Sequence, residues 1–188
     1  MKIHDSPEHV TPECAEDERT LDAPEARWAD HFESAYSLRP NDAYEANEYH
    51  YQTDRFGRIS RCEGSLRLED GKRNTAHQTR AGGEDRLEGD QGGHLIGFRF
   101  NGSEKIDNIV PMDGRLNQGE YKQLENEWAA ELKKGNTVDV TIRCVYRDDS
   151  ARPSFFVVKY TVTDENGFAH REMRRLSNEP QGRKGVTP

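Results

Sequence analysis

The sequence predicts an α+β fold, in which a mainly antiparallel β-sheet packs against one dominant helix of about residues 118–134. The helix is predicted by apolar side chains that recur every three or four residues and so share one helical face: Tyr121, Leu124, Trp128, Ala129 and Leu132. Gly135 ends this pattern, and Asn117 stands where an N-cap residue is expected. Strand-like runs joined by short turns predict the sheet.

Three of these strand-like runs follow the helix. Residues 138–146 and 155–162 are rich in β-branched and aromatic side chains and flank a polar turn. The Asp-Glu-Asn-Gly turn at 164–167 then leads to a last strand near 168–176. Short turns join strands that pair antiparallel, which is the basis for the predicted sheet.

The chain before the helix gives weaker signals. Residues 58–68 are interpreted as a strand, and residues 70–93, which are rich in glycine, glutamine and charged residues, as a loop. A short apolar strand is expected over 94–100. The stretch 107–116 is expected to turn around its proline and glycine.

The first fifty residues differ in character from the rest. They hold four basic and thirteen acidic residues and four prolines, so residues 1–50 are predicted to form a partly disordered acidic arm or a linker from a larger parent protein. A short helix within 24–38 could dock this arm through Trp28, Phe32 and Tyr36. The folded domain is expected over 51–178, followed by a frayed tail over 179–188.

The charge distribution leaves a nucleic-acid partner open. The net charge is -8, which by itself argues against such a partner. Beyond residue 50, however, 23 basic residues stand against 22 acidic ones, so that part of the chain can carry a local basic groove. The acidic arm could in turn occupy such a groove as a charge mimic.

Composition also narrows the location of the protein. No apolar run approaches the roughly 18 residues that span a membrane, so no membrane segment is expected. The first eight residues lack the apolar core of a signal peptide. If the protein is exported, we expect a route that needs no cleavable signal peptide. Cys14, Cys62 and Cys144 are odd in number and widely spaced, and are interpreted as buried or free thiols.

Among seven histidines, His94 has the most informative surroundings. It follows two glycines and precedes Leu95 and Ile96, so it stands where a glycine loop becomes an apolar segment. A histidine held there could act as a general base near neutral pH. A structural histidine would show the same pattern. The other six lie in polar surroundings and are interpreted as surface residues.

Asn117 and Glu125 are eight residues apart, a little over two helical turns, and can share one helix face. Amide and carboxylate oxygens are hard ligands that suit Mg²⁺, which keeps several of its waters. Taken singly, Asn117 could be only a helix cap and Glu125 only a solvated charge.

Several motifs together resemble one known family. Residues 81–87 read AGGEDRL, residues 89–96 read GDQGGHLI and residues 107–112 read DNIVPM; the run LNQG at 116–119 then leads on to Glu125 and Trp128. In order, spacing and helix placement, the span from about 51 to 160 resembles the DNA/RNA non-specific endonucleases of the His-Me finger (ββα-metal) superfamily. It is most similar to the branch found as toxin domains of secreted bacterial proteins.

The resemblance implies a role for each matched residue. His94 would be the general base that takes a proton from the attacking water. Asn117 would be the direct protein ligand of a hydrated Mg²⁺, for which Mn²⁺ could substitute. Glu125 would assist the metal and its water shell, and Asn108 would help to orient the site.

Two departures from the wider family concern substrate binding. The family's common form has an arginine two places before the histidine, where this chain has Gly92, and often a glutamine after Val-Pro, where this chain has Met112. The toxin-like branch accepts both changes, so the arginine that binds the phosphate is expected elsewhere. The candidates, in order, are Arg86, Arg80 and Arg99, and the alternative for each is an ordinary surface arginine.

The resemblance therefore implies a Mg²⁺-dependent endonuclease of DNA and RNA that serves as a secreted antibacterial toxin, with a cognate immunity protein as partner and the target-cell cytoplasm as its place of action. Two alternatives stay open. One is a nuclease for nutrient scavenging or DNA uptake. The other is a non-catalytic binding module on the same scaffold, since fold alone does not fix function.

Overall fold

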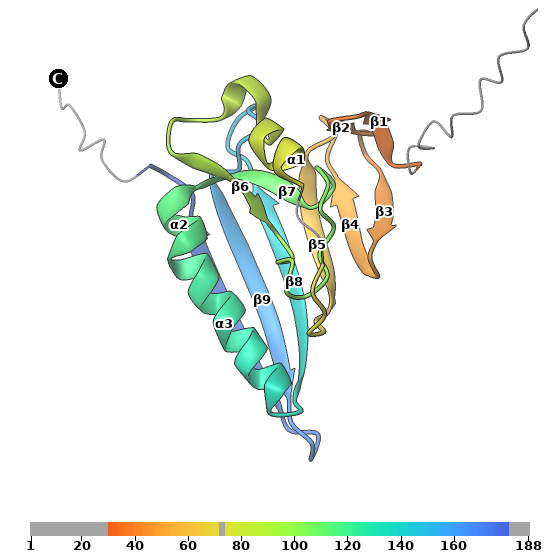
Figure 1. Ribbon diagram of the computed structural model, residues 1–188, viewed down its shortest axis with the longest axis vertical. Coiled ribbons are helices and arrows are strands. Elements are labelled where there is room, and N and C mark those ends of the chain that lie inside the picture. Colours follow the sequence, from red (N-terminus) through yellow and green to blue (C-terminus); the bar gives the residue numbers. More distant parts are fainter. Residues whose placement is uncertain (1–29, 72–73, 181–188) are drawn as a thin grey trace, which may run out of the picture.

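The computed structural model describes residues 30–71 and 74–180. Its largest element is a six-stranded antiparallel sheet of order β10-β9-β8-β5-β4-β3 (Figure 1). The strands are β3 (Ala43–Ala46), β4 (Tyr49–Thr53), β5 (Ile59–Ser65), β8 (Thr137–Val145), β9 (Phe155–Thr163) and β10 (Ala169–Ser177). The three C-terminal strands were predicted from sequence, and their antiparallel pairing is confirmed.

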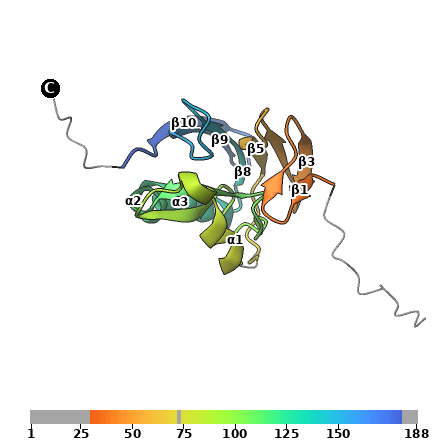
Figure 2. The ribbon, with the colours of Figure 1, turned by 90° about the horizontal axis from the view of Figure 1, so that it is seen from above.

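The helices lie on one side of this sheet, as the view from above shows (Figure 2). The dominant helix is α3 (Glu120–Lys133), close to the predicted 118–134, and it follows the short α2 (Gly114–Gln118). A further short helix, α1 (Thr75–Arg80), covers part of the same side. The α+β prediction with one dominant helix is thereby confirmed.

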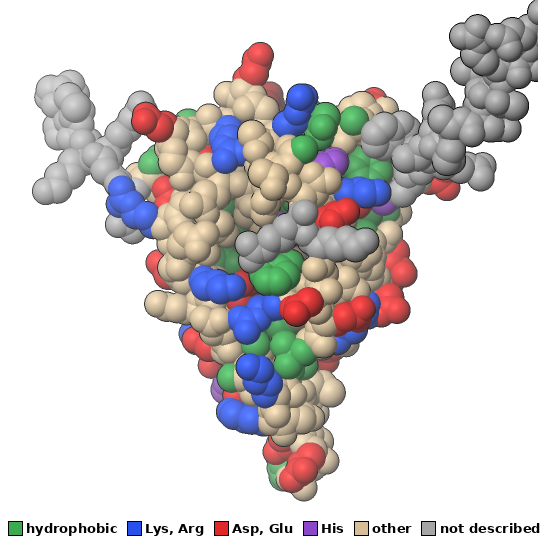
Figure 3. Space-filling model, in the orientation of Figure 1, with side chains coloured by type: hydrophobic (Ala, Val, Ile, Leu, Met, Phe, Trp, Pro, Cys, Tyr) green, Lys and Arg blue, Asp and Glu red, His purple; other side chains and the backbone are tan. Residues whose placement is uncertain are grey.

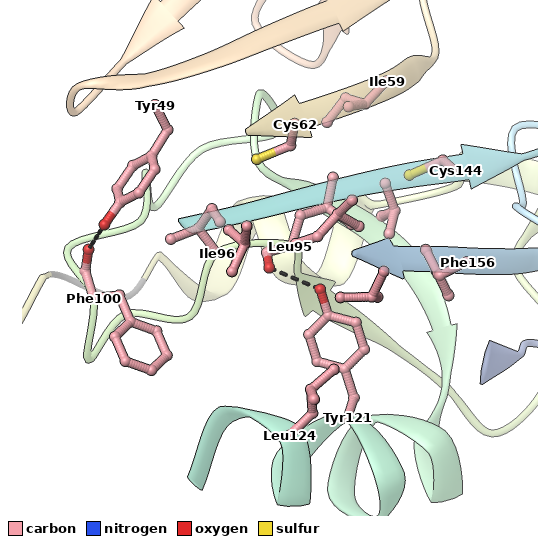
Figure 4. Close-up of a cluster of buried hydrophobic side chains, with 14 of the residues drawn as sticks. Tyr49, Ile59, Cys62, Leu95, Ile96, Phe100, Tyr121, Leu124, Cys144 and Phe156 are labelled. Atoms are coloured by element: carbon pink, nitrogen blue, oxygen red, sulfur yellow. Dashed lines mark hydrogen bonds between the residues drawn. The ribbon is translucent and has the colours of Figure 1, made fainter. Parts of the chain in front are cut away.

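The core lies between α3 and the sheet. Trp128 and Phe156 are fully buried there, and Trp128 meets the ring of Tyr160 edge-on at 5.8 Å between centroids. Tyr121 sits under the sheet beside Phe156, and its hydroxyl donates to the backbone oxygen of Leu95, 2.7 Å away (Figure 4). A buried tyrosine hydroxyl needs such a partner, so this bond ties α3 to the chain that follows His94.

A second, two-stranded sheet joins the helices into a ββα unit. It consists of β6 (Asp90–His94) and β7 (Ile109–Asp113), paired antiparallel so that His94 faces Ile109. The chain runs on from β7 into α2 and α3. We call β6, β7, α2 and α3 together the ββα unit; it is the predicted metal-finger architecture.

Two buried polar contacts anchor the ββα unit to the large sheet. Arg152, in the loop between β8 and β9, makes a two-pronged ion pair with the Asp90 carboxylate at 2.7 and 2.9 Å. Asn178, just after β10, accepts from the backbone N–H of Asp113 and donates to the carbonyl oxygens of Pro111 and Pro153. The end of the β6–β7 ribbon at which Asp90 pairs with Asp113 therefore depends on residues late in the chain.

The structure differs from the prediction in the first part of the chain. The expected helix over 24–38 is wrong for its described residues, which form β1 (Phe32–Ser34) and β2 (Ser37–Leu38); Trp28 and the rest lie outside them. The predicted boundary at residue 51 falls inside β4, so residues 43–50 belong to the large sheet. The division into arm, domain and tail otherwise stays a prediction.

The segment before the dominant helix also differs. The expected loop over 70–93 contains α1, whose N-cap Asn74 accepts hydrogen bonds from two backbone N–H groups, and it contains most of β6. The strand ends at His94 instead of beginning there, and 107–116 holds β7 in place of a turn. Pro111 is compatible with a strand because β7 pairs with β6 alone and keeps one edge free of a partner strand.

Other expectations concern single residues. Cys62 and Cys144 are buried free thiols, as predicted, while Cys14 lies outside the described residues. His31 is not the surface residue that was expected, since it is 6% exposed and its Nε2 lies 3.0 Å from the Asp107 carboxylate. Across the described ranges, no helix is long and apolar enough to span a membrane.

Candidate active site

The backbone around His94 is fixed on both sides. His94 is the last residue of β6 and is half-buried. The next residue, Leu95, donates its N–H to the carbonyl oxygen of Asn108 at 2.9 Å and accepts from the Tyr121 hydroxyl. Burial raises the pKa of Tyr121 well above its usual value, so this hydroxyl stays a donor at any physiological pH. The imidazole therefore projects from a segment with little freedom to move.

Asn108 holds the chain that follows His94. It is 0% exposed, and its Oδ1 accepts from the Ile96 N–H and from the Tyr51 hydroxyl, both at 2.9 Å. Its Nδ2 donates to the carbonyl oxygens of Ile96 and Ser103. All four hydrogen-bonding positions of the amide are thus in use. In this arrangement Asn108 can orient the site but cannot itself contact a substrate.

Asn117 lies in α2 and faces β6. Its half-buried side chain donates from Nδ2 to Oε1 of Gln91, 2.7 Å away. It does not cap the dominant helix, because that position falls within α2, and the cap of α2 is Asp113, which accepts from the N–H groups of Arg115 and Leu116. With Nδ2 occupied by Gln91, the Oδ1 of Asn117 is the atom left to bind a cation.

Glu125 comes from α3 and lies against the loop after His94. The residue is only 8% exposed, and its Oε2 accepts from Lys122 Nζ at 3.0 Å. A Cβ placed on Gly97 would come 2.3 Å from Glu125 Oε1, so only glycine at this position lets the carboxylate approach the loop. The lysine offsets part of the cost of burying the carboxylate.

Together, these contacts place Asn117 beside a residue that precedes His94 and Glu125 beside a residue that follows it. The partner of Asn117 is Gln91, three residues before the histidine, and the neighbour of Glu125 is Gly97, three residues after it. The structure therefore brings both predicted metal-side residues onto the short segment that carries the predicted base. The contact of Asn117 with Gln91 and the approach of Glu125 to Gly97 could not be read from the sequence spacing alone.

The three candidate arginines have different surroundings. Arg86 donates to the carbonyl oxygens of Gln78, Thr79 and Asp90, and so clamps the end of α1 to the start of β6. Arg80 is exposed and lies over the ring of Tyr36 at 4.4 Å. Arg99 donates to Oδ1 of Asn126 at 2.6 Å and is thereby held beside the residue that follows Glu125.

Both departures from the wider family lie in closely packed surroundings. A Cβ at Gly92 would lie 2.3 Å from the backbone oxygen of Gln78, so α1 fills the space that a side chain would need. A Cβ at Gly93 would lie 2.8 Å from the side chain of Met112, which is fully buried. The glycine pair before the histidine thus lets α1 and Met112 pack on opposite faces of β6.

The candidate residues are partly covered, since His94 and Asn117 are half-buried and Glu125 is only 8% exposed. Lys and Arg side chains follow one another down the middle of the face shown in Figure 3, while Asp and Glu side chains gather along its right side. A groove of about 600 Å³ lies elsewhere and is lined by Tyr36, Phe56, Arg80 and Pro111 among others. His94, Asn117 and Glu125 do not border it. An exposed basic face suits a polymeric anion better than a small ligand.

The available donors fit a hydrated hard cation. Asn117 offers an amide oxygen and Glu125 a carboxylate, while the described residues contain no cluster of three or more His, Cys, Asp or Glu that could enclose a metal ion. Mg²⁺ commonly keeps most of its waters and takes one or two protein oxygens. A closed structural zinc site would need four nitrogen or sulfur ligands.

Sequence reasoning missed two polar residues at this site. Gln91 was read only as part of a motif, because its contact with Asn117 joins β6 to α2 and cannot be read from the sequence. Lys122 was not singled out, although its spacing to Glu125 is the i to i+3 spacing of neighbours on a helix. Gln91 is placed by its contacts with α2, and Lys122 by its contact with Glu125 within α3.

Comparison with known proteins places these features in a family context. A sequence model of the DNA/RNA non-specific endonuclease family matches residues 40–164. The type VII secretion system protein EssD of Staphylococcus aureus (strain USA300) is 38% identical over 149 residues, which cover 75% of this chain and 24% of that protein. EssD of strain NCTC 8325 / PS 47 gives the same values. The chain spans about a quarter of the length of these curated relatives.

Solved structures show the same fold. The Sda1 nuclease with a bound zinc ion aligns with a TM-score of 0.57 at 16% identity, covering 71% of this chain and 75% of that one. EndoG, in its complex with EndoGI, aligns with a TM-score of 0.53 at 15% identity, covering 73% of this chain and 74% of that one. At such identities the alignments establish a shared architecture.

Proposed function

The chain belongs to the DNA/RNA non-specific endonuclease family, and we propose that it hydrolyses phosphodiester bonds of DNA and RNA with Mg²⁺, His94 acting as the base. The observation that carries this proposal is the ββα unit, in which His94 at the end of β6 lies between the contacts made by Asn117 and Glu125. Mn²⁺ is expected to replace Mg²⁺, because it accepts the same oxygen ligands.

His94 would take a proton from the water that attacks the phosphorus atom. The bond from that water oxygen to phosphorus forms as the bond to the leaving oxygen breaks, and His94 carries the released proton away. A base that sits on a fixed strand end keeps its geometry during this transfer. The bonds of Leu95 to Asn108 and Tyr121 provide that fixation.

Asn117 and Glu125 would hold the cation. Asn117 Oδ1 would ligate it directly, and the Glu125 carboxylate would accept hydrogen bonds from its waters. When bound, the cation supplies positive charge where the phosphate oxygens gain negative charge. Lys122 fixes the direction of the Glu125 carboxylate, because it donates to Oε2 and leaves Oε1 facing the loop at Gly97.

Arg99 is the candidate for phosphate binding that the surroundings favour. It is held by Asn126, which follows Glu125 on α3, whereas three backbone carbonyls occupy most of the donors of Arg86. Arg80 lies on the ring of Tyr36, beside the separate groove. A guanidinium can bind two phosphate oxygens at once, so one correctly placed arginine is enough for positioning.

The biological setting is proposed from the relatives. EssD is named as a type VII secretion system protein, which supports a role for this chain as the effector domain of an antibacterial secreted toxin delivered without a cleavable signal peptide. It would act in the cytoplasm of the target cell. EndoG is inhibited in its complex with EndoGI, which supports a cognate immunity protein as the partner of this chain.

The proposal is tested by degradation of plasmid DNA and of RNA with Mg²⁺, with Mn²⁺ and with EDTA. We expect His94→Ala and Asn117→Ala to lower the rate by about 10²- to 10⁴-fold, and EDTA to abolish it. The control is His170→Ala, which removes an exposed histidine on the edge strand β10. Wild-type activity in His94→Ala would refute the proposed role of the base.

A further inference from the structure

The side chain of Gln91 lies at the centre of a small amide network. Its Oε1 accepts from Asn117 Nδ2 at 2.7 Å and from Gln118 Nε2 at 2.8 Å. Gln91 belongs to β6, and both donors belong to α2. One carbonyl oxygen on the strand that carries His94 therefore receives two N–H groups from the helix that carries Asn117.

This network fixes which end of each amide points where. Only the oxygen of a primary amide accepts hydrogen bonds, and only its nitrogen donates. Turning Asn117 by 180° would bring its oxygen against Gln91 Oε1, and turning Gln91 would bring N–H groups against two other N–H groups. Either change would replace a favourable contact with a repulsive one, so the three amides hold one another in a single orientation.

The orientation of Asn117 matters for a metal ligand. A hard cation binds the amide oxygen and is repelled by the N–H end. An asparagine that can turn freely presents the wrong end for part of the time, which weakens binding. Residues that hold a ligand from behind commonly change metal affinity by 10- to 100-fold when they are removed.

We propose that Gln91 is a positioning residue, which holds Asn117 Nδ2 so that Oδ1 faces the divalent cation. This inference rests on the proposed function, because it assumes that Asn117 is the ligand. It predicts that the essential property of residue 91 is an acceptor oxygen at the right distance. A merely structural role, in which Gln91 only fastens α2 to β6, makes a different prediction.

The decisive measurement is Mn²⁺ binding, followed by the electron paramagnetic resonance signal of free Mn²⁺ in titrations of the whole chain. Gln91→Met, which keeps the side-chain length but removes the acceptor, is expected to weaken binding about 10-fold or more. Gln91→Glu keeps an acceptor oxygen and is expected to bind at least as tightly as wild type. Gln91→Ala also removes the acceptor oxygen, with a smaller side chain, and is expected to weaken Mn²⁺ binding as well. Gln123→Met is the matched control on the exposed face of α3.

An Asn117→Asp background separates positioning from fastening. A carboxylate has an oxygen at both ends, so its orientation no longer matters. In this background Gln91→Met should change Mn²⁺ affinity by less than about 3-fold, which corresponds to roughly 0.6 kcal/mol. The carboxylate of Asn117→Asp cannot donate to Gln91, so if Gln91 only fastens the two elements, it still does so through Gln118, and Gln91→Met should weaken binding more than about 3-fold in this background too.

The outcomes distinguish this inference from the proposed function. If Asn117→Ala binds Mn²⁺ as wild type does, the ligand assignment itself is wrong. If Asn117→Ala fails to bind but Gln91→Met and Gln91→Ala bind normally, only the positioning role is overturned. Equal losses in Gln91→Met and Gln91→Glu would also overturn it, because the acceptor oxygen would then not be the property that counts.

Discussion

The hydroxyl of Tyr51 on β4 donates to Oδ1 of Asn108, 2.9 Å away, and so links the large sheet to the loop that follows the candidate base. The same oxygen accepts the Ile96 N–H, two residues after His94. Tyr51 is fully buried and its ring stacks on that of Tyr44 at 5.1 Å. An early strand of the chain therefore supports the position of the histidine.

Tyr51→Phe is expected to lower both stability and turnover. The change leaves the stacked ring and removes one hydrogen bond to a buried amide, which costs about 1–3 kcal/mol of unfolding free energy. Urea denaturation measures that loss. Tyr146→Phe, which removes a similar bond to the carbonyl oxygen of Ile59, is the control. If kcat of the two folded variants falls equally, the link from Tyr51 to the His94 loop has no functional role.

Gly92→Ala is expected to destabilise the protein because α1 lies directly on this glycine. The added methyl group would contact the Gln78 backbone, and overpacking of this kind typically costs about 1–3 kcal/mol. Gly83→Ala is the comparison. That residue has open space around it, and only its left-handed backbone resists the change, at about 1–2 kcal/mol.

The arginine of the common family motif should therefore not be tolerated at position 92. Gly92→Arg is expected to lose more stability than Gly92→Ala and to give no gain in activity, as measured by urea denaturation and plasmid cleavage. A stable and more active Gly92→Arg would show that α1 moves easily from β6.

Arg99 is expected to bind the substrate, and Arg86 is expected to stabilise the fold. Arg99→Ala should raise KM for DNA several-fold and make binding less sensitive to salt, because one phosphate contact is lost. Arg86→Ala should mainly lower the free energy of unfolding, because three backbone carbonyls lose their donor. Salt-dependent KM values and urea curves for both variants check this, and the reverse pattern would exchange the two roles.

His77 is expected to make stability fall in acid. Burial lowers its pKa below the usual 6.5, and its Nδ1 accepts the Ile106 N–H at 3.1 Å, which requires an unprotonated nitrogen. Below pH 6.5 the unfolded chain binds this proton more readily than the folded chain, so the free energy of unfolding falls as pH decreases. His77→Asn keeps an acceptor without titrating, and should flatten urea stability between pH 5 and 6.5.

The dominant helix was predictable, whereas the short elements around it were not. Tyr121, Leu124 and Trp128 are spaced so that they share one buried helix face. A local pattern was therefore enough to show which side of the helix packs against the rest of the protein. Helix α1 buries none of its residues and shows no such pattern. Its existence depends on the Asn74 cap and on the contact with Gly92, and that contact joins positions that are distant in sequence.

The same distinction applies to the site and to the first strands. The spacing of Phe32 and Tyr36 suggested a helix, yet Phe32 packs beside His31 and Tyr36 lies under Arg80, contacts that the sequence does not reveal. The motif residues were found because the family resemblance supplied their spacing. The role of Gln91 depends on its pairing with α2, which only the structure provides, whereas the spacing of Lys122 to Glu125 is visible in the sequence.

The bonds of Asn178 have a consequence for protein synthesis. Its side chain holds the backbone of Pro111 and Asp113, so the ribbon that leads into α2 lacks these bonds until nearly the last described residue has been made. In a nascent chain these bonds can form only after a residue 65 positions beyond Asp113 has left the ribosome. The β6–β7 ribbon is therefore expected to gain its full set of bonds later than its own residues are synthesised, once β10 has emerged.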